Sequence, residues 1–218
     1  MPQVFHRSSN TLARLSIVTG AALLVSSVLI GSNLSRSPYA TQVGVPVDQP
    51  VPFSHKHHVK ELGIDCRYCH STVEKSAVAS VPPTHTCMSC HSQVWTNSPL
   101  LEPIRQSYLN GTPVQWNKVY DLPDFVYFNH SIHVQKGIGC TTCHGPIHEM
   151  NITYKAQPLS MSWCLDCHRQ PEKYIRPREE VFNYNYQPPA NQMELGKKLV
   201  QEYHIQKGQL TNCSICHR

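Results

Sequence analysis

The sequence predicts a chain of short α-helices and irregular loops, preceded by one long apolar helix. Two observations predict the irregular part: proline is abundant, at 17 of 218 residues, and the cysteines fall into five short motifs spread along the chain. Proline interrupts both helices and strands, so little strand and no long element are expected there. A third observation predicts the long helix, because residues 15–35 carry no charge. Charged residues make up only 15% of the chain, which excludes charge-rich disorder and coiled coils.

The segment 15–35, LSIVTGAALLVSSVLIGSNLS, has the length of a transmembrane helix. At the rise of an α-helix it spans about 31 Å, the thickness of the hydrocarbon core of a bilayer. The alternative is a cleaved secretory signal, whose apolar stretch is usually shorter, at about 7–15 residues. Arg7 and Arg14 precede the segment and Arg36 follows it. The positive-inside bias therefore places residues 1–14 in the cytoplasm and exports residues 36–218.

All ten cysteines lie in five C-x-x-C-H motifs. The motif residues are Cys66, Cys69 and His70; Cys87, Cys90 and His91; Cys140, Cys143 and His144; Cys164, Cys167 and His168; and Cys213, Cys216 and His217. In a helical turn, positions i, i+3 and i+4 share one face. The two thiols can then bond to the two vinyl groups of one porphyrin, while the histidine binds the iron. This pattern is typical of covalently attached haem c.

Zinc binding and redox dithiol chemistry are the alternatives for any single C-x-x-C motif. Zinc ribbons do not require a histidine after each second cysteine, and a disulfide scaffold would not give this regularity. Here the histidine follows in all five motifs, and no cysteine lies outside them. The sequence therefore predicts five haem c groups, each with a motif histidine as an axial ligand of its iron.

Five haems leave about 37 residues of exported chain for each, too few to build a large apolar core around every one. We therefore expect the porphyrins themselves to form much of the core. Their ten propionates also exceed the formal net charge of +5, so the basic balance of the chain needs no acidic partner. The lysines and arginines are scattered and form no basic stripe, which excludes nucleic acid as a partner.

Residues 53–70 and 128–144 are two copies of one unit. FSHKHHVKELGIDCRYCH and FNHSIHVQKGIGCTTCH share nine of 17 aligned positions once one gap is allowed. Each copy is followed by a second motif. The repeat predicts a linker at 36–52, a first di-haem module with its connector at 53–127, and a second di-haem module with a C-terminal fifth haem at 128–218.

Two further helices are predicted between the motifs. Leu195, Leu199 and Tyr203 recur at helical spacing within residues 191–206, after a possible cap at Asn191. We expect the face that these residues form to pack beside the fifth haem. A helical turn is also predicted near Leu100–Tyr108.

Eight histidines lie outside the five motifs and the N-terminal tail, whereas five irons need only five further ligands. These eight are His55, His57, His58, His85, His130, His133, His148 and His204. The residues alone leave the choice open, although His57 aligns with Ile132 and is expected to be exposed.

The F-x-H-x-x-H pattern before a C-x-x-C-H motif resembles the small class III cytochromes c with three or four haems. In that family the first histidine binds the haem iron of the following motif, and the second binds that of the next motif. The resemblance implies the pairs His55 with His70, His58 with His91, His130 with His144 and His133 with His168. It also implies that the haem of His217 takes its second ligand from the segment with His148, Met150 and Met161, while His204 is nearer in sequence. We expect His148 or Met150.

A wider resemblance rests on the single anchor, the five motifs, the stretch 98–130 and the segment PLSMSWCLDCHRQ (158–170). These are similar to the pentahaem subunit of alternative complex III, a quinol-oxidising membrane complex of bacteria. Ser162 departs from the glycine expected before Trp163. The resemblance implies partners: an iron–sulfur/molybdopterin-like subunit, polytopic quinol-binding subunits and a monohaem cytochrome c. It also implies a single-pass protein of the bacterial inner membrane, in contact with the lipid bilayer, with its haem domain on the periplasmic face.

These features predict an electron-transfer subunit without catalytic residues, because an iron with two protein ligands cannot bind a substrate. One alternative is a catalytic multihaem reductase with one open haem, which would bind carbon monoxide in its native state. Another is a stand-alone quinol dehydrogenase of the tetrahaem type, which would oxidise quinol without partner subunits.

Overall fold

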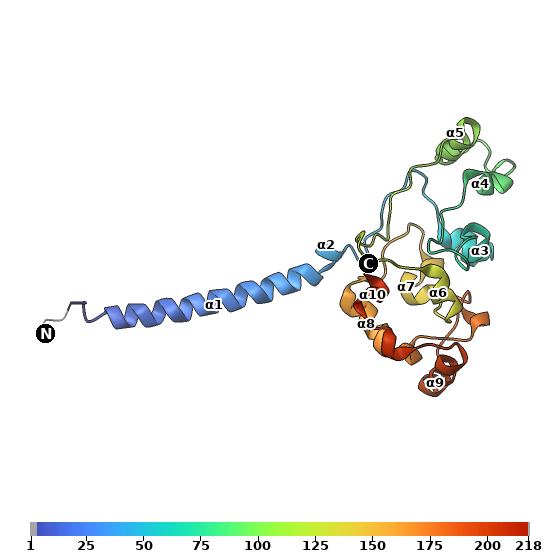
Figure 1. The fold of residues 1–218 in the computed structure, drawn as a ribbon. Coiled ribbons are helices and arrows are strands. Elements are labelled where there is room, and N and C mark those ends of the chain that lie inside the picture. Colours follow the sequence, from blue (N-terminus) through green and yellow to red (C-terminus); the bar gives the residue numbers. More distant parts are fainter. Residues whose placement is uncertain (1–3, 218) are drawn as a thin grey trace. The chain divides into compact units, whose positions relative to one another are not determined.

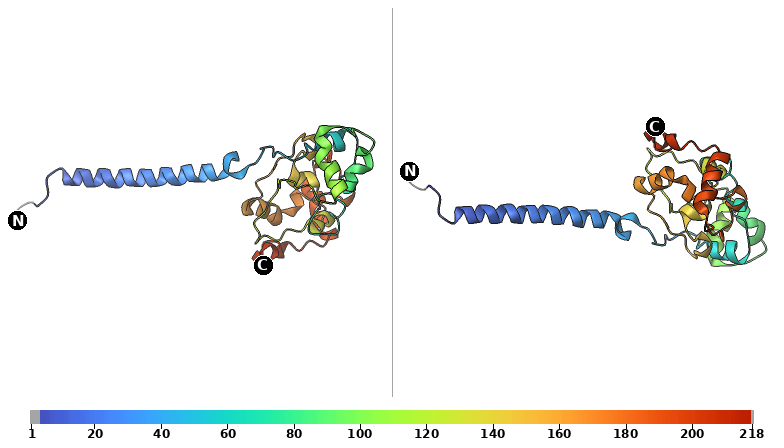
Figure 2. Two further views of the ribbon diagram at one scale, coloured as in Figure 1. Left: turned by 90° about the horizontal axis from the view of Figure 1, so that it is seen from above. Right: turned by 90° about the horizontal axis from the view of Figure 1, so that it is seen from below.

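The computed structural model describes residues 4–217; residues 1–3, which belong to the predicted cytoplasmic tail, and residue 218 lie outside the described residues. The chain divides into two compact units, Met1–Val43 and Gly44–Arg218 (Figures 1 and 2). The predicted boundary at residue 128 between two haem modules falls inside the second unit and stays a prediction.

The first unit is dominated by one long helix, α1 (Ser9–Arg36), followed by the short α2 (Pro38–Thr41). No residue of α1 is buried within the chain, and its length and hydropathy are those of a membrane span. A signal sequence near an N-terminus has the same properties. The hydroxyls of Ser16 and Ser27 and the amide of Asn33 donate hydrogen bonds to carbonyls one turn earlier. These polar side chains are therefore satisfied within the helix, as an apolar surrounding requires.

The second unit consists of short helices joined by long loops, as predicted (Figure 1). Among the described residues there is no β-strand, only isolated bridges at Pro46–Tyr154 and Ile138–Ile175. Its α-helices are α3 (Cys66–Cys69), α4 (Thr84–His91), α5 (Glu102–Asn110), α6 (His130–Gln135), α7 (Cys140–His144), α8 (Met161–Arg169), α9 (Gln192–Glu202) and α10 (Cys213–Cys216). The remaining turns are η1 (Lys56–Glu61), a π-helix, and the 3-10 helices η2 (Pro99–Leu101), η3 (Ile147–Glu149), η4 (Pro171–Lys173), η5 (Arg178–Glu180) and η6 (Lys207–Gln209).

Each of the five cysteine motifs lies on a short helix, namely α3, α4, α7, α8 and α10. Polar side chains start two of these turns. Asp65 accepts a hydrogen bond from the backbone N–H of Arg67 at 2.8 Å, and Ser160 accepts one from Trp163 at 3.4 Å. These bonds satisfy N–H groups that the first turn of a helix leaves free. The two cysteines of each motif are thus held on one face of a helical turn.

The two copies of the repeat differ in helix type at the position where their sequence alignment contains a one-residue gap. In η1 the N–H of Leu62 donates to the carbonyl of His57, five residues earlier, at 3.0 Å. In α6 the N–H of Lys136 donates to Ile132, four residues earlier, also at 3.0 Å. A single inserted residue widens one turn of a helix into a π-helix. The extra residue follows the second histidine, so the F-x-H-x-x-H spacing is unchanged.

The apolar core of the second unit is small. Ile175, Leu199 and Tyr203 are buried together. Ile138, Leu195, Val200 and Ile205 pack against them. The predicted helix at 191–206 runs over 192–202, and its apolar face lies on Ile175 and η4, just after the fourth motif. Gly196 allows this close approach, because a Cβ there would collide with the backbone of Glu172.

Candidate functional site

Three of the four expected histidine pairs have their ring centres at a common distance. The ring centres of His58 and His91 lie 6.2 Å apart, those of His130 and His144 6.5 Å, and those of His133 and His168 6.2 Å. An imidazole nitrogen binds a transition metal at about 2.0 Å and lies about 1.1 Å from its ring centre. Two imidazoles on opposite sides of one metal ion therefore have centres about 6.2 Å apart. The chemistry and spacing of these pairs fit a haem iron with two histidine ligands.

The fourth expected pair, His55 with His70, is close in space as well. Burial, together with the nearby imidazoles of His70, His144 and His58, lowers the pKa of His55 to about 4. The Nδ1 atom of His55 lies 3.1 Å from the hydroxyl of Thr153. His55 thus lies close to the motif histidines of both the first and the third motif.

Most of the expected ligands share a second feature that the sequence does not reveal, a backbone carbonyl within hydrogen-bond distance of Nδ1. The partners are Ser54 for His58, Ser80 for His70, Val94 for His91, Ala77 for His130, Asn129 for His133, Leu210 for His168 and Phe125 for His217, at 2.7–3.1 Å. A carbonyl can only accept, so Nδ1 carries the proton and Nε2 keeps its lone pair. Metal-binding histidines usually show this arrangement.

His57 behaves differently from its neighbours. Its Nδ1 atom lies 2.8 Å from a carboxylate oxygen of Glu61, one turn along η1, and its side chain is 39% exposed. The ring stacks on the exposed Trp95, with centres 5.9 Å apart. This agrees with its position opposite Ile132 in the repeat, where no ligand is expected.

A phenylalanine contacts the two expected ligand histidines of each copy in the same way. Phe53 lies edge-on to His55 at 4.9 Å and stacks on His58 at 4.4 Å. In the second copy the distances to His130 and His133 are 4.7 and 4.5 Å, with the same two orientations. The repeated phenylalanine thus sets the planes of two imidazoles that belong to two neighbouring motifs.

The surroundings of His55, His58, His133 and His144 lower the pKa of these imidazoles and so favour the neutral form. Burial is the main cause that lowers the pKa of His58 and of His133, and it lowers that of His144 to about 4, with His130 and His70 adding to the effect. Only a neutral imidazole can bind a metal ion. The ring of Tyr120 packs against His144, with centres 4.5 Å apart.

None of the ten cysteines forms a disulfide. Burial raises the pKa of Cys143 to about 11 and that of Cys167 to about 12, with neighbouring groups adding to both shifts. Within residues 4–217, no three histidine, cysteine or acidic side chains are grouped to hold one metal ion, as a zinc site would require.

Contacts between motif helices place the motifs in one row, with the second motif beside the first. The hydroxyl of Tyr68 in α3 lies 3.0 Å from that of Ser89 in α4. The first motif lies beside the third, because the thiols of Cys66 and Cys140 form a hydrogen bond. That bond lowers the pKa of Cys66 to about 7 and raises that of Cys140.

The row continues through the fourth and fifth motifs. Burial raises the pKa of Cys143 with a contribution from the nearby thiol of Cys164. Burial raises the pKa of Cys164, and the nearby thiol of Cys216 contributes to this increase. Leu210, three residues before the fifth motif, supplies the carbonyl for His168. The spatial order of the motifs is therefore second, first, third, fourth and fifth.

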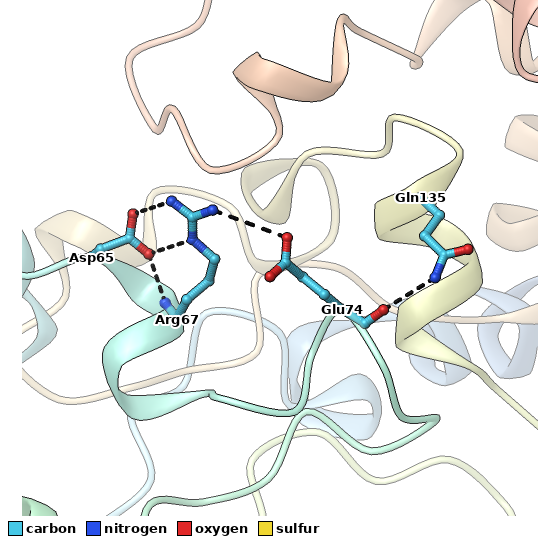
Figure 3. Close-up of polar contacts among 4 residues, drawn as sticks. All are labelled: Asp65, Arg67, Glu74 and Gln135. Atoms are coloured by element: carbon cyan, nitrogen blue, oxygen red, sulfur yellow. Dashed lines mark hydrogen bonds and ion pairs between the residues drawn. The ribbon is translucent and has the colours of Figure 1, made fainter.

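Residues 72–80 tie the first and third motifs together. Ser80 accepts from the His70 ring, and Ala77 accepts from both the ring and the backbone N–H of His130. Figure 3 shows a second link nearby, in which Arg67 pairs with Asp65 at 2.8 Å and approaches Glu74 at 4.0 Å. The side chain of Gln135 in α6 donates to the backbone carbonyl of Glu74 at 3.1 Å (Figure 3).

The expected first ligand of the fifth motif, His217, has a carbonyl partner but no histidine ring paired with it among the described residues. His217 donates to the carbonyl of Phe125 at 3.1 Å and lies against the Phe125 ring. His148 stacks instead on Tyr184 at 4.4 Å, and Met150 is buried, with its carbonyl accepting from Lys56. The expected role of His148 or Met150 at this haem therefore stays a prediction.

The C-x-x-C-H motifs on short helices and the closely spaced histidine pairs define the class of this protein as a multihaem cytochrome c. A family model described as "Cytochrome c7 and related cytochrome c" matches residues 126–218 of this chain. The chain is also 33% identical over 142 residues to the menaquinone reductase, multihaem cytochrome c subunit, of Nitratidesulfovibrio vulgaris (strain Hildenborough). That alignment covers 56% of this chain and 68% of its relative. The chain belongs to the same family of multihaem cytochromes c and holds several haem c groups.

Proposed function

We propose that this chain is the electron-transfer subunit of a quinone-reactive membrane complex and that it holds five haem c groups. The observation that carries the proposal is the set of closely spaced histidine pairs, in which most of the rings have Nδ1 bonded to a backbone carbonyl and so keep the lone pair on Nε2. Within the described residues, three pairs have ring centres 6.2–6.5 Å apart. This spacing is the one that two imidazoles on one iron require.

The residues of the chain have distinct roles in this proposal. The ten motif cysteines would attach the five haems, two thiols to each. The five motif histidines would bind iron from one side, and His55, His58, His130 and His133 would bind from the other at four of the sites. Backbone carbonyls and the two phenylalanines fix the rings, so little reorganisation accompanies a change in iron charge. A bound haem supplies a one-electron couple at its iron.

The row of motifs supports a relay rather than catalysis. Each motif lies beside the next, from the second at one end to the fifth at the other. The histidine pairs leave no open coordination position at their sites. We infer that the two end motifs, around His91 and His217, face the two redox partners.

Similarity to a subunit of menaquinone reductase supports a quinone-reactive complex as the partner, with α1 as the anchor. Residues 98–130 resemble instead the pentahaem subunit of alternative complex III. Both resemblances support a role as one subunit of a larger complex. The resemblance to alternative complex III implies as partners an iron–sulfur/molybdopterin-like protein, polytopic quinone-binding subunits and a monohaem cytochrome c. The two resemblances differ in direction, because one complex reduces the quinone and the other oxidises the quinol. We favour quinone reduction, since the identity to that relative extends over 142 residues.

The test is to isolate the chain with its partners from native membranes. We expect a pyridine haemochrome assay to give five haems per polypeptide, and protein sequencing to find polytopic subunits in the same preparation. Reduction of a menaquinone analogue by the reduced complex would support quinone reduction, whereas oxidation of the quinol alone would support the alternative complex III assignment. Far fewer than five haems would refute the proposal.

The two remaining alternatives give separate outcomes. If the chain alone oxidises quinol, it is a dehydrogenase of the tetrahaem type. If the reduced native protein binds carbon monoxide in a one-to-one ratio, one haem is open and a catalytic role follows. We expect no quinol oxidation by the chain alone and no carbon monoxide binding at the four haems with paired histidines.

A further inference from the structure

Arg176 is a buried cation without an acidic partner. Only 6% of the residue is exposed. Among residues 4–217, no carboxylate lies within 4 Å of its guanidinium. Its two terminal nitrogens donate to the carbonyl of Asn183 at 3.4 Å and to the hydroxyl of Thr142 at 3.5 Å, both long contacts. The carboxylate of Glu180 accepts from the Asn183 side chain instead.

Two buried polar atoms at this site have no hydrogen-bond partner. They are Nε of Arg176 and the hydroxyl of Tyr186. The guanidinium stands over the Tyr186 ring, 4.5 Å from its centre. An N–H and a phenolic O–H both donate, so the pair lacks an acceptor.

The site adjoins the third cysteine motif. A Cβ on Gly139 would overlap the guanidinium of Arg176, so the glycine leaves the room that the cation occupies. Gly139 directly precedes Cys140, and Thr142 lies inside the same motif. The uncompensated charge is thus next to a haem attachment point.

Contact with an aromatic ring does not explain the burial of Arg176. Arg178, two residues later, stands over Tyr203 at 4.3 Å and donates to the carbonyl of Gln135 at 2.8 Å, yet it is exposed. A buried charge is strongly unfavourable unless an opposite charge and further hydrogen bonds compensate it. Arginine and a phenol are also a suitable donor set for a carboxylate.

We propose that Arg176 and Tyr186 form a carboxylate-binding site that holds a propionate of one of the bound haems. This inference rests on the proposed function, because the haems are the source of the carboxylate. Through this contact Arg176 also raises the reduction potential of that haem, since a nearby positive charge favours the ferrous state. Removing the cation leaves the propionate charge uncompensated beside the iron and favours the ferric state.

The experiment uses the full-length haem-loaded protein and the variants Arg176→Met, Arg176→Lys and Tyr186→Phe. The matched control is Arg178→Met, which removes a neighbouring arginine with the same kind of aromatic contact. Spectroelectrochemical titration measures the individual potentials, and resonance Raman spectroscopy reports the propionate bending mode. We expect Arg176→Met to shift the ferric-to-ferrous equilibrium of one haem at least tenfold toward ferric, which is 59 mV for one electron. Arg176→Lys and Tyr186→Phe should give smaller shifts in the same direction, and Arg178→Met none.

The outcomes separate this inference from the proposed function. If the wild-type protein carries five haems but Arg176→Met leaves all potentials and the propionate band unchanged, the carboxylate site is wrong and the relay stands. If the wild-type protein lacks the haems, the proposed function itself fails. Should Arg176→Met not fold, unchanged potentials and an unchanged propionate band in both Arg176→Lys and Tyr186→Phe would overturn the inference.

Discussion

The two repeat helices, η1 and α6, position their F-x-H-x-x-H histidines alike although one is a π-helix and the other an α-helix. The distances from phenylalanine to the two histidines agree within 0.2 Å between the copies. The Nδ1 atom of the second histidine faces the carbonyl four residues earlier in each copy. The comparison teaches that the phenylalanine and the carbonyl set the ligand geometry, while the end of the helix is free to vary.

The two copies also differ in what surrounds them. The second copy is covered by the small core of Ile175, Leu199 and Tyr203, to which Ile138 from its own loop contributes. The first copy adjoins α4 and Trp95, and Trp95 is 61% exposed. Protein packing therefore supports the second copy, whereas the first depends more on the groups bound to it.

The largest expected effect comes from removing one second ligand in each copy. His58→Ala and His133→Ala should each abolish the low-spin signal of one haem, allow carbon monoxide to bind it, and raise its potential. Absorption and magnetic circular dichroism spectra of the reduced proteins measure this. His57→Ala is the matched control and should leave the spectra unchanged. Carbon monoxide binding by His57→Ala, with none by His58→Ala, would reverse the assignment.

The difference in packing is tested by Leu199→Ala. Leu199 is 4% exposed, and removing a buried leucine side chain destabilises a protein by about 2–5 kcal/mol. Thermal unfolding of the haem-loaded protein should show the loss. Leu62→Ala, at an exposed position of the first copy, should change the midpoint by much less. Equal losses of thermal stability in the two variants would contradict the proposed difference in packing between the two copies.

A smaller, pH-dependent effect is expected at Asp65, which caps α3 (Figure 3). The hydrogen bonds from Arg67 hold the pKa of its carboxyl below the ordinary value of 3.8. Because the folded state lowers this pKa, the stabilisation is present above pH 3.8 and is lost as the pH falls through the folded value. Asp65→Asn should lower stability by about 1 kcal/mol or less at neutral pH, and the difference should vanish in acid. A difference that grows as the pH falls would disprove this account.

The smallest effect is predicted for deletion of Leu62. The deletion makes the first copy as long as the second and should convert η1 into an α-helix. The ligand spectra should stay those of the wild type, because the Phe53, His55 and His58 spacing is untouched. Inserting one residue after Lys136 is the reciprocal variant. A change of spin state in either protein would show that the helix end does position the ligands.

Much of this architecture is readable from the sequence, because covalent attachment fixes the identity and spacing of the motif residues. The five turns, the long apolar helix and the repeat are all local patterns. The distant carbonyl partners were not readable. Leu210 lies 42 residues from His168, and Ala77 lies 53 residues from His130. Nothing in the local sequence marks a carbonyl as an acceptor. The π-helix could have been found from the one-residue gap between the copies.

The segment 72–80 bears on how the protein can be divided. It belongs to the first half of the repeat, yet the carbonyl of Ala77 accepts hydrogen bonds from His130 in the second half. A fragment that begins at residue 126, where the cytochrome c7 match starts, would expose that imidazole N–H to solvent and free the ring to turn. The halves of this duplicated chain have thus become mutually dependent, and maturation of the later haems should require the earlier segment to be present.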